Sequence, residues 1–329
     1  MTTNVLPRTK SFTWGDESAV APLEYHDTPA MLTTVRRSSL QSERATGEMG
    51  TLMIGGPDRK GIHAAVAQLM YDHGVHIVHS AQHLDSGGGL FFERIRFDLT
   101  EITSDRATLE GAVRDLCTRY GMDYRLYGDR KKRIAILCSR QEHCLYDLLV
   151  RYRAGDLPPC EIALIVSNHP NAAACATHFG VPFVHLPVTP DTKAKQEAQM
   201  LALLREQNIE LIVLARYMQI LSPAFVERYP TRIINVHHSF LPAFIGANPY
   251  RQAYERGVKL IGATSHYVTS DLDQGPILEQ EVVRCSHRDG VEDLMRKGRD
   301  LEKRVLAAGI RWHLEDRILV HANKTVVFE

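Results

Sequence analysis

The fold and the chemistry of this chain centre on the stretch INVHHSFLP, which runs from Ile234 to Pro242. Just before it, Arg232-Ile233-Ile234 ends in β-branched residues that lead directly into a polar cluster, a pattern typical of the end of a short buried strand. Residues two apart in a strand point to the same face, so we expect Asn235 and His237 to project together. An amide donor beside an imidazole suits a carbonyl group that develops negative charge on its oxygen.

A carboxylate follows downstream at Asp273, just before the turn Gln274-Gly275-Pro276. A loop at this point can return Asp273 to the imidazole of His237, where it would fix the tautomer, raise the pKa of His237 or hold a water molecule. Taken singly, each feature has a structural alternative, because Asp273 can equally cap a turn. His238 would face the opposite side of an extended segment, so we expect a structural role for it.

Together these motifs, Asn-x-His-x-Ser-x-Leu-Pro followed by Asp-x-Gly-Pro, resemble the folate-dependent formyltransferase superfamily. The segments INVHHSFLPAFIGANPYRQAY (Ile234–Tyr254) and IGATSHYVTSDLDQGPILEQ (Ile261–Gln280) are most similar to its formyltetrahydrofolate deformylase branch. The resemblance covers about residues 50–329. It implies hydrolysis of 10-formyltetrahydrofolate to tetrahydrofolate and formate, which balances the one-carbon folate pool and supplies formate for purine synthesis.

The resemblance also implies the roles of individual residues. Asn235 would donate to the formyl oxygen, His237 would be a second donor or the acid, and Asp273 would orient water and keep His237 charged. The segment Tyr217–Pro223 matches the part of the superfamily whose main chain binds the pterin ring. The expected substrate-binding residues are Met218, Gln219, Leu221, Gly246, Thr269, Ser270 and Asp271. No metal and no cofactor is expected, since the folate is the substrate. Residues 244–249 form either a lid or a plain turn.

Composition sets broad limits on function. With 329 residues, 44% of them apolar, the chain can bury two cores, and 39 basic residues balance 39 acidic ones. This balance argues against nucleic-acid or anionic-membrane partners, and no apolar run approaches the roughly 18 residues of a membrane span. Six scattered cysteines without a CxxC pair indicate reduced thiols. We expect a cytoplasmic protein. Arg8 and Lys10 leave mitochondrial import as the alternative, which Asp16 and Glu17 weaken.

The N-terminal third predicts an arm and a small α/β domain. Residues 1–48 lack hydrophobic periodicity and are expected to be disordered. Residues 49–128 predict a βαββαβ (ferredoxin-like) order that resembles an ACT domain. That resemblance implies a homo-oligomer, dimer or tetramer, paired through sheet edges, with an amino-acid effector possible near the turn Asp58–Ile62. The expected elements are strands at Thr51–Gly55, Val75–Leu84, Leu90–Leu99 and Met122–Tyr127, and helices beginning at Ile62 and Asp105.

Beyond the charged run Asp129–Arg133, which we interpret as a solvated linker rather than a phosphate-binding patch, residues 134–329 predict a catalytic domain. Continuously apolar strands alternate with helical patterns, which indicates a doubly wound, mostly parallel α/β sheet of the formyltransferase type. No GxGxxG follows its first strand, so dinucleotide binding is disfavoured. The expected strands are Ile134–Leu137, Glu161–Val166, Phe183–Leu186, Leu211–Leu214 and Pro276–Arg284, followed by a helix at Gly290–Leu314 and a hairpin around Asn323.

Three alternatives remain for the function. A glycinamide ribonucleotide formyltransferase needs a Gly-rich phosphate loop after its first strand, whereas Cys138–His143 contains no glycine and adds Glu142. A methionyl-tRNA formyltransferase would carry a further basic C-terminal domain. A non-catalytic folate or amino-acid sensor would not need Asn235, His237 and Asp273 together. Water is therefore the expected acceptor.

A metal site formed by His73, His76, His79 and His83 is disfavoured, because their spacing is loose.

Overall fold

A computed structural model of the chain describes residues 48–243 and 249–329. All of them belong to one compact unit, Ala45–Glu329. The expected N-terminal arm, apart from Glu48, lies outside the described residues, and so does Gly246 with the rest of residues 244–248. The described residues form a four-stranded sheet, a seven-stranded sheet and a two-stranded hairpin. No helix in this described part is long and apolar enough to cross a membrane.

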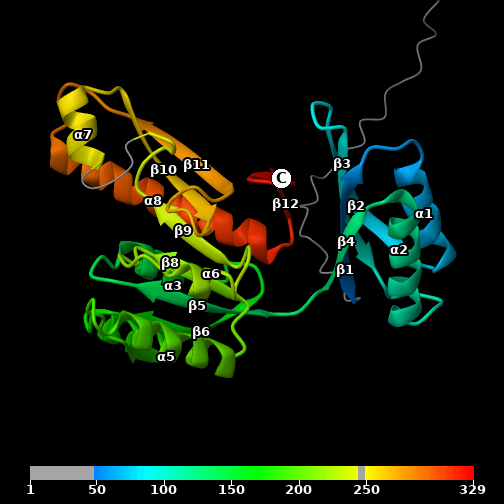
Figure 1. Ribbon diagram of the computed structural model, residues 1–329, viewed down its shortest axis with the longest axis horizontal. Coiled ribbons are helices and arrows are strands. Elements are labelled where there is room, and N and C mark those ends of the chain that lie inside the picture. The colour runs from blue at the N-terminus through cyan, green and yellow to red at the C-terminus, as the bar shows by residue number, and fades with distance from the viewer. Residues whose placement is uncertain (1–47, 244–248) are drawn as a thin grey trace, which may run out of the picture. The chain divides into compact units, whose positions relative to one another are not determined.

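The four-stranded sheet confirms the βαββαβ prediction. Its strands have the order β2-β3-β1-β4 and pair antiparallel throughout, and both helices pack on one face of it (Figure 1). Asp105 caps the second helix by accepting a hydrogen bond from the main-chain N–H of Thr108 at 2.7 Å. The elements are β1 (Met49–Pro57), α1 (Ile62–Asp72), β2 (His76–Asp85), β3 (Leu90–Asp98), α2 (Arg106–Tyr120) and β4 (Asp123–Gly128).

The seven-stranded sheet is mostly parallel, as predicted. The order is β11-β10-β9-β8-β5-β6-β7; the strands from β9 to β7 are parallel, and β10 and β11 are antiparallel. The strands are β5 (Lys132–Cys138), β6 (Cys160–Ser167), β7 (Phe183–His185), β8 (Leu211–Ala215), β9 (Ile233–His237), β10 (Leu260–Tyr267) and β11 (Ile277–Arg284). The helices are α3 (His143–Ala154), α4 (Ala173–Phe179), α5 (Lys193–Glu206), α6 (Pro223–Val226), α7 (Pro249–Arg256) and α8 (Val291–Leu314).

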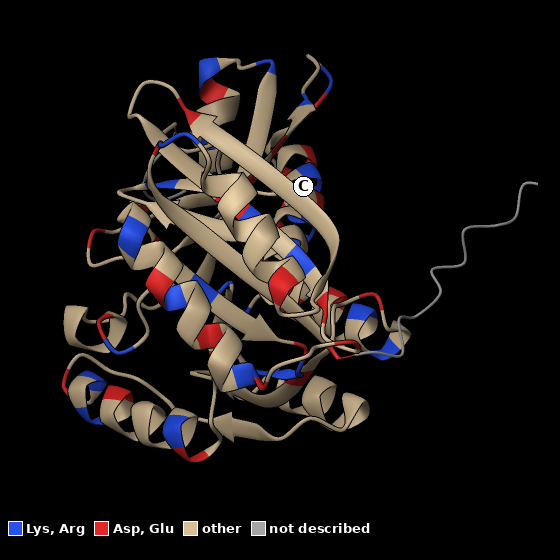
Figure 2. Ribbon diagram, turned by 90° about the vertical axis from the view of Figure 1, so that its right-hand side faces the viewer, with Lys and Arg blue, Asp and Glu red and all other residues tan. Residues whose placement is uncertain are grey.

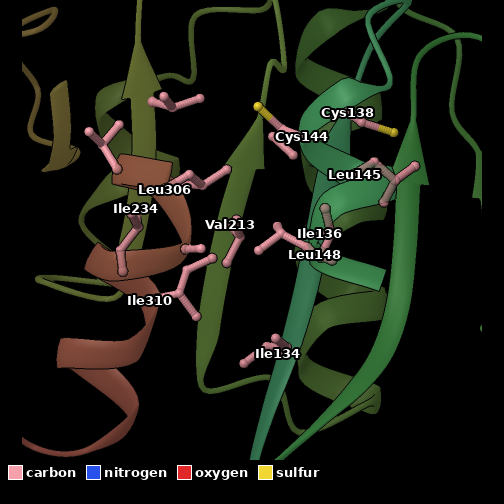
Figure 3. Close-up of a cluster of buried hydrophobic side chains, with 14 of the residues drawn as sticks. Ile134, Ile136, Cys138, Cys144, Leu145, Leu148, Val213, Ile234, Leu306 and Ile310 are labelled. Carbon is pink, nitrogen blue, oxygen red and sulfur yellow. The ribbon is translucent and has the colours of Figure 1, made fainter. Parts of the chain in front are cut away.

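Both faces of the central part of this sheet are buried, which is why strand β8 and the second part of β5 (Ile134–Cys138) are apolar at every position. Helices α3, α4, α7 and α8 cover one face, and α5 and α6 cover the other. Figure 3 shows side chains of α3 and α8 that meet those of β5, β8 and β9, among them Leu148, Leu306, Ile310, Ile136, Val213 and Ile234. On the surface, acidic and basic side chains are interspersed along the helices (Figure 2), in keeping with the balanced charge of the sequence.

The charged run before the large sheet differs from the expectation in one respect. Strand β5 begins at Lys132, two residues earlier than predicted, because Lys132 and Arg133 pair with Cys160 and Glu161 of β6. The Lys132 ammonium donates to the main-chain carbonyls of His313 and Leu314, at 3.2 and 3.0 Å, near the end of α8. A cation there complements the helix dipole. Lys132 is therefore a partly buried structural residue and not a solvated one.

The last strands, β12 (Ile318–His321) and β13 (Lys324–Val327), form the predicted hairpin. Phe328, just after β13, packs against Met53 and Phe92 of the four-stranded sheet. Arg94 of β3 donates to the carbonyls of Asp316 and Glu315, at 2.7 and 2.9 Å.

Candidate active site

Strand β9 carries Asn235 and His237 to the carboxyl end of the parallel strands, where ligands of such sheets bind. The two residues lie on the same face, as the strand alternation predicts. The neighbouring antiparallel strand β10 pairs His266 with Asn235 and Thr264 with His237. His266 Nε2 consequently lies 3.2 Å from the Asn235 amide nitrogen, while His266 Nδ1 is 2.9 Å from the carbonyl of Tyr267. The sequence interpretation missed His266, since only the register of two distant strands brings it here.

Asp273 reaches the imidazole from the loop between β10 and β11. Its Oδ2 lies 3.2 Å from Nδ1 of His237, and its Oδ1 lies 3.6 Å from Nε2 of His266. The loop turns back tightly: Asp273 has a positive φ of 55°, and a Cβ on Gly275 would come within 1.7 Å of the Tyr267 carbonyl oxygen. Glycine at position 275 is therefore what allows the loop to approach β10 closely enough to present the carboxylate.

The charge of Asp273 determines which ring nitrogen of His237 is left free for a substrate. Burial alone would raise the pKa of Asp273, but its interactions with His237 and His266 outweigh this effect and hold that pKa well below its ordinary value. Asp273 is therefore an anion at neutral pH and accepts from Nδ1–H of His237. The other ring nitrogen of His237, Nε2, is buried and has no hydrogen-bond partner among the described residues. A buried nitrogen of this kind is available to a substrate.

A cavity of about 350 Å³ opens beside these residues. Asn235, His237 and Asp273 line it together with five of the expected substrate contacts, namely Met218, Gln219, Leu221, Thr269 and Ser270. Its mouth is apolar, because Met218, Ile220 and Leu272 each leave more than half of their surface exposed. Such a patch suits a flat, largely apolar ring system.

Two residues, Asp271 and His238, differ from the expectation at this site, and a third, Gly246, is not tested. Asp271 does not line the cavity; its carbonyl accepts from the Thr269 hydroxyl at 3.1 Å and so stabilises the turn. Gly246 lies outside the described residues. His238 does line the cavity, contrary to the prediction that it faces away, because β9 ends at His237 and the strand alternation stops there. The His238 ring stacks on that of His237, with 5.0 Å between ring centroids.

Known proteins share both the sequence and the fold of this chain. The formyl transferase family model matches residues 132–310. A formyltetrahydrofolate deformylase from Bacillus subtilis is 48% identical over 283 residues, which cover 85% of this chain and 94% of that protein. A formyltetrahydrofolate deformylase from Escherichia coli is 40% identical over 277 residues, which cover 82% of this chain and 95% of that protein. This chain belongs to the formyltetrahydrofolate deformylase family.

Solved structures agree with this family assignment. The crystal structure of a formyltetrahydrofolate deformylase from Pseudomonas syringae pv. tomato has a TM-score of 0.84 and 44% identity, and the match covers 87% of this chain and 96% of that one. A glycinamide ribonucleotide transformylase from Symbiobacterium toebii, with a TM-score of 0.58 and 31% identity, matches 62% of this chain. The deformylase likeness thus extends over more of the chain than the transformylase likeness.

In this deformylase family member, a second polar group adjoins the site. Arg216, at the end of β8, is buried and donates from Nη1 to Nδ1 of His238 at 2.6 Å. Burial, then the charges of Arg216 and His237, lower the pKa of His238 to about 4. His238 is therefore neutral at pH 7. Since its Nδ1 accepts from Arg216, its proton lies on Nε2.

One group of described residues has the composition of a metal site: His143, Cys144 and Glu302, whose ligand atoms lie within 4.8 Å of one another. His143 Nε2 and the Tyr250 hydroxyl already bind Glu302, at 2.7 and 2.8 Å. Burial raises the pKa of the Cys144 thiol far above its ordinary value, so the thiolate that a metal would need is disfavoured. Direct hydrogen bonds account for the closeness of His143 and Glu302, and Cys144 is a buried core residue.

Proposed function

We propose that this chain hydrolyses 10-formyltetrahydrofolate to tetrahydrofolate and formate. The observation that carries the proposal is the His237–Asp273 pair. It leaves Nε2 of His237 without a partner among residues 48–243 and 249–329, beside Asn235 and next to a cavity with an apolar mouth. Deformylase relatives that are 40–50% identical over more than four fifths of the chain support the same reaction.

The residues divide the chemistry as follows. The amide of Asn235 and Nε2–H of His237 donate to the formyl oxygen, on which negative charge develops as water attacks the formyl carbon. The anion of Asp273 stabilises the charged imidazole and orients the water. The water loses a proton to the Asp273 carboxylate as it attacks, and His237 gives a proton to N10 when the C–N bond breaks; the proton held by Asp273 then returns to His237, which restores the pair. Overall, one water is consumed, and tetrahydrofolate, formate and one proton are released.

The folate ring is proposed to bind along the segment after β8, through main-chain groups of Gln219 and Leu221 with Met218 as an apolar wall. Thr269 and Ser270 face it from the other side. A pteridine offers a row of donors and acceptors that a main chain can match. The cavity lining supports these assignments.

The experiment that tests the function is simple. Purified protein is mixed with 10-formyltetrahydrofolate without any added acceptor, and formate and tetrahydrofolate are both quantified. Equal amounts of the two products are expected. Consumption of the substrate only after glycinamide ribonucleotide is added would contradict the proposal and favour a transferase.

The four-stranded sheet is proposed to mediate homo-oligomer assembly. Strand β2 lies at the edge of this sheet, and its residues Val78 and Leu84 are at least half exposed. An edge strand with unpaired main-chain groups is normally covered, and a two-fold axis through β2 would give a dimer. Val78→Lys should then dissociate the oligomer in sedimentation experiments, whereas Val150→Lys, on the exposed face of α3, should not.

An amino-acid effector is proposed at the start of α1. Gly61 precedes this helix with a φ of 88° and offers no side-chain cap, so the first main-chain N–H groups can hold a carboxylate. His63, in the first turn, binds the fully buried carboxylate of Glu93 at 2.6 Å. The second oxygen of Glu93 has no hydrogen-bond partner in the described part of the chain, so it can accept from an ammonium group. A thermal-shift screen of the common amino acids, with His63→Ala as the comparison, tests this site.

A further inference from the structure

A second cavity, of about 430 Å³, adjoins the reaction cavity and shares three of its residues. Arg216, Met218 and His238 line both, so they form the partition between the two spaces. The far wall of the second cavity is built by the first residues of α7 and by one face of α8. These two helices lie side by side (Figure 1). The α8 residues on this wall follow helical spacing and are Val291, Met295, Arg299 and Glu302.

The floor of this cavity is a preformed polar network. Gly298 of α8 packs directly under the Tyr250 ring, where a Cβ would come within 2.0 Å of the Tyr250 hydroxyl. This close approach lets Tyr250 donate to Glu302 at 2.8 Å. Arg216 donates to Gln141 at 2.8 Å and lies 3.6 Å from Glu302. Each of these polar groups is held by others, so the floor does not need a ligand to be stable.

The charge of the cavity is positive. Burial alone would raise the pKa of Glu302, but its interactions with His143, Arg216 and Tyr250 outweigh this effect and keep that pKa low, so Glu302 carries one negative charge. Three guanidinium groups oppose it: those of Arg216, Arg251 and Arg299. Arg251 and Arg299 are exposed, and neither forms an ion pair with a carboxylate of the described residues. The guanidinium groups of Arg251 and Arg299 therefore line the cavity without an anionic partner in the described part of the chain.

We propose that this second cavity binds formate on its way out of the reaction cavity, with Arg251 and Arg299 contacting the carboxylate. This inference rests on the proposed hydrolysis, which produces a small carboxylate at His237. His238 lies between the two spaces and, with its proton on Nε2, offers the ion a donor as it passes. The volume exceeds that of one formate, so the ion keeps part of its hydration water. The geometry is that of an exit compartment and not of a close-fitting pocket.

The affinity of the second cavity for formate must be low. Formate has three heavy atoms, and the limit on binding energy per atom gives a Kd no tighter than about 1 mM. Product inhibition is therefore measured with added formate up to roughly a hundred times that concentration, at constant ionic strength with chloride as the replacement anion. Because this cavity lies outside the proposed folate cavity, formate can bind while the substrate is bound. Inhibition is expected to be noncompetitive toward 10-formyltetrahydrofolate.

Two variants and a matched control make the test specific. Arg299→Gln and Arg251→Gln are each expected to raise the Ki of formate about three- to tenfold, as loss of one charge-assisted contact at an exposed site predicts. Arg296→Gln is the control: it is on the same helix and exposed, but it pairs with Asp293 and does not line the cavity. It should leave the Ki unchanged.

Direct binding separates this proposal from the hydrolysis itself. ¹³C-formate line broadening, measured on wild type and on the double variant Arg251→Gln/Arg299→Gln, needs no turnover. If the wild type produced no formate, the proposed hydrolysis would be wrong. The line-broadening experiment would still show whether the second cavity binds formate, because it does not depend on turnover. Strictly competitive inhibition, an unchanged Ki in both single variants, or an equal effect of Arg296→Gln would overturn the exit-compartment proposal. Tighter binding of glycinamide ribonucleotide, weakened by the same variants, would overturn it in favour of an acceptor site.

Discussion

Asp273 Oδ2 lies 3.2 Å from Nδ1 of His237, which leaves the opposite ring nitrogen buried and without a partner among the described residues. A carboxylate in this position selects one tautomer of the imidazole and stabilises its charged form. The proposed chemistry depends on this contact more than on any other in the structure.

Replacing the carboxylate should therefore separate activity from stability. Asp273→Asn keeps the size of the side chain but removes its charge, and we expect formate release to fall about a hundredfold or more. Circular dichroism and thermal unfolding should stay close to wild type. Asp300→Asn, on the exposed surface of α8, is the matched control and should keep full turnover. A half-active Asp273→Asn enzyme with an unchanged melting temperature would contradict the assignment.

His266 is predicted to position Asn235. It lies 3.2 Å from the Asn235 amide and is almost fully buried. His266→Ala should lower kcat about tenfold while KM changes little, because the donor to the formyl oxygen would lose its orientation. His266→Gln can replace the hydrogen bond and should recover part of the loss. Equal kcat for the two variants would show that His266 only fills space.

Gly275→Ala should displace the main chain of the loop that carries Asp273. The added Cβ would meet the carbonyl oxygen of Tyr267 at 1.7 Å, so the loop that carries Asp273 must move away from β10. We expect a loss of roughly 1–3 kcal/mol in the free energy of unfolding, with a marked fall in formate release. Gly111→Ala, in helix α2 with no close contact, should instead be neutral or slightly stabilising. Denaturant titrations of both variants provide the comparison.

The stability of the protein should depend on pH through His238. Its pKa is lowered to about 4 in the folded chain, whereas an unfolded histidine titrates near 6.5. Between these values the unfolded chain binds a proton that the folded chain does not. Stability should therefore fall as the pH drops from about 6.5 toward 4, by up to about 1.4 kcal/mol per pH unit from this group. His313, whose pKa burial lowers to about 3, adds a further contribution of the same sign.

His238→Asn tests this dependence. The variant has no titrating imidazole at position 238, so its unfolding free energy should decline less steeply between pH 6.5 and 4 than that of wild type. Urea titrations at half-unit steps of pH measure both slopes. Identical slopes would contradict the lowered pKa, because they would mean that His238 takes up its proton at the same pH in the folded and the unfolded chain.

The local parts of this structure could be predicted from the sequence, and the long-range parts could not. Strand alternation alone places Asn235 and His237 on one face, and apolar strands alone indicate the covered parallel sheet. His266 could not be found this way, because its place depends on the register of β10 against β9. The predicted orientation of His238 was wrong, because no local sequence signal shows that β9 ends at His237. The turn after Asp273 indicated that a loop could return this carboxylate to His237, but the close contact between Gly275 and Tyr267 that brings the loop to β10 depends on the fold.

The central claim is tested most directly by formate release from 10-formyltetrahydrofolate, without an acceptor, for wild type and Asn235→Ala. The wild type should release formate and tetrahydrofolate in equal amounts. Asn235→Ala should retain its melting temperature and lose about 10²–10³ in kcat, the typical effect of removing one donor to the developing oxyanion. Near-normal turnover in the folded variant, or faster formylation of added glycinamide ribonucleotide than release of formate by wild type, would contradict this account.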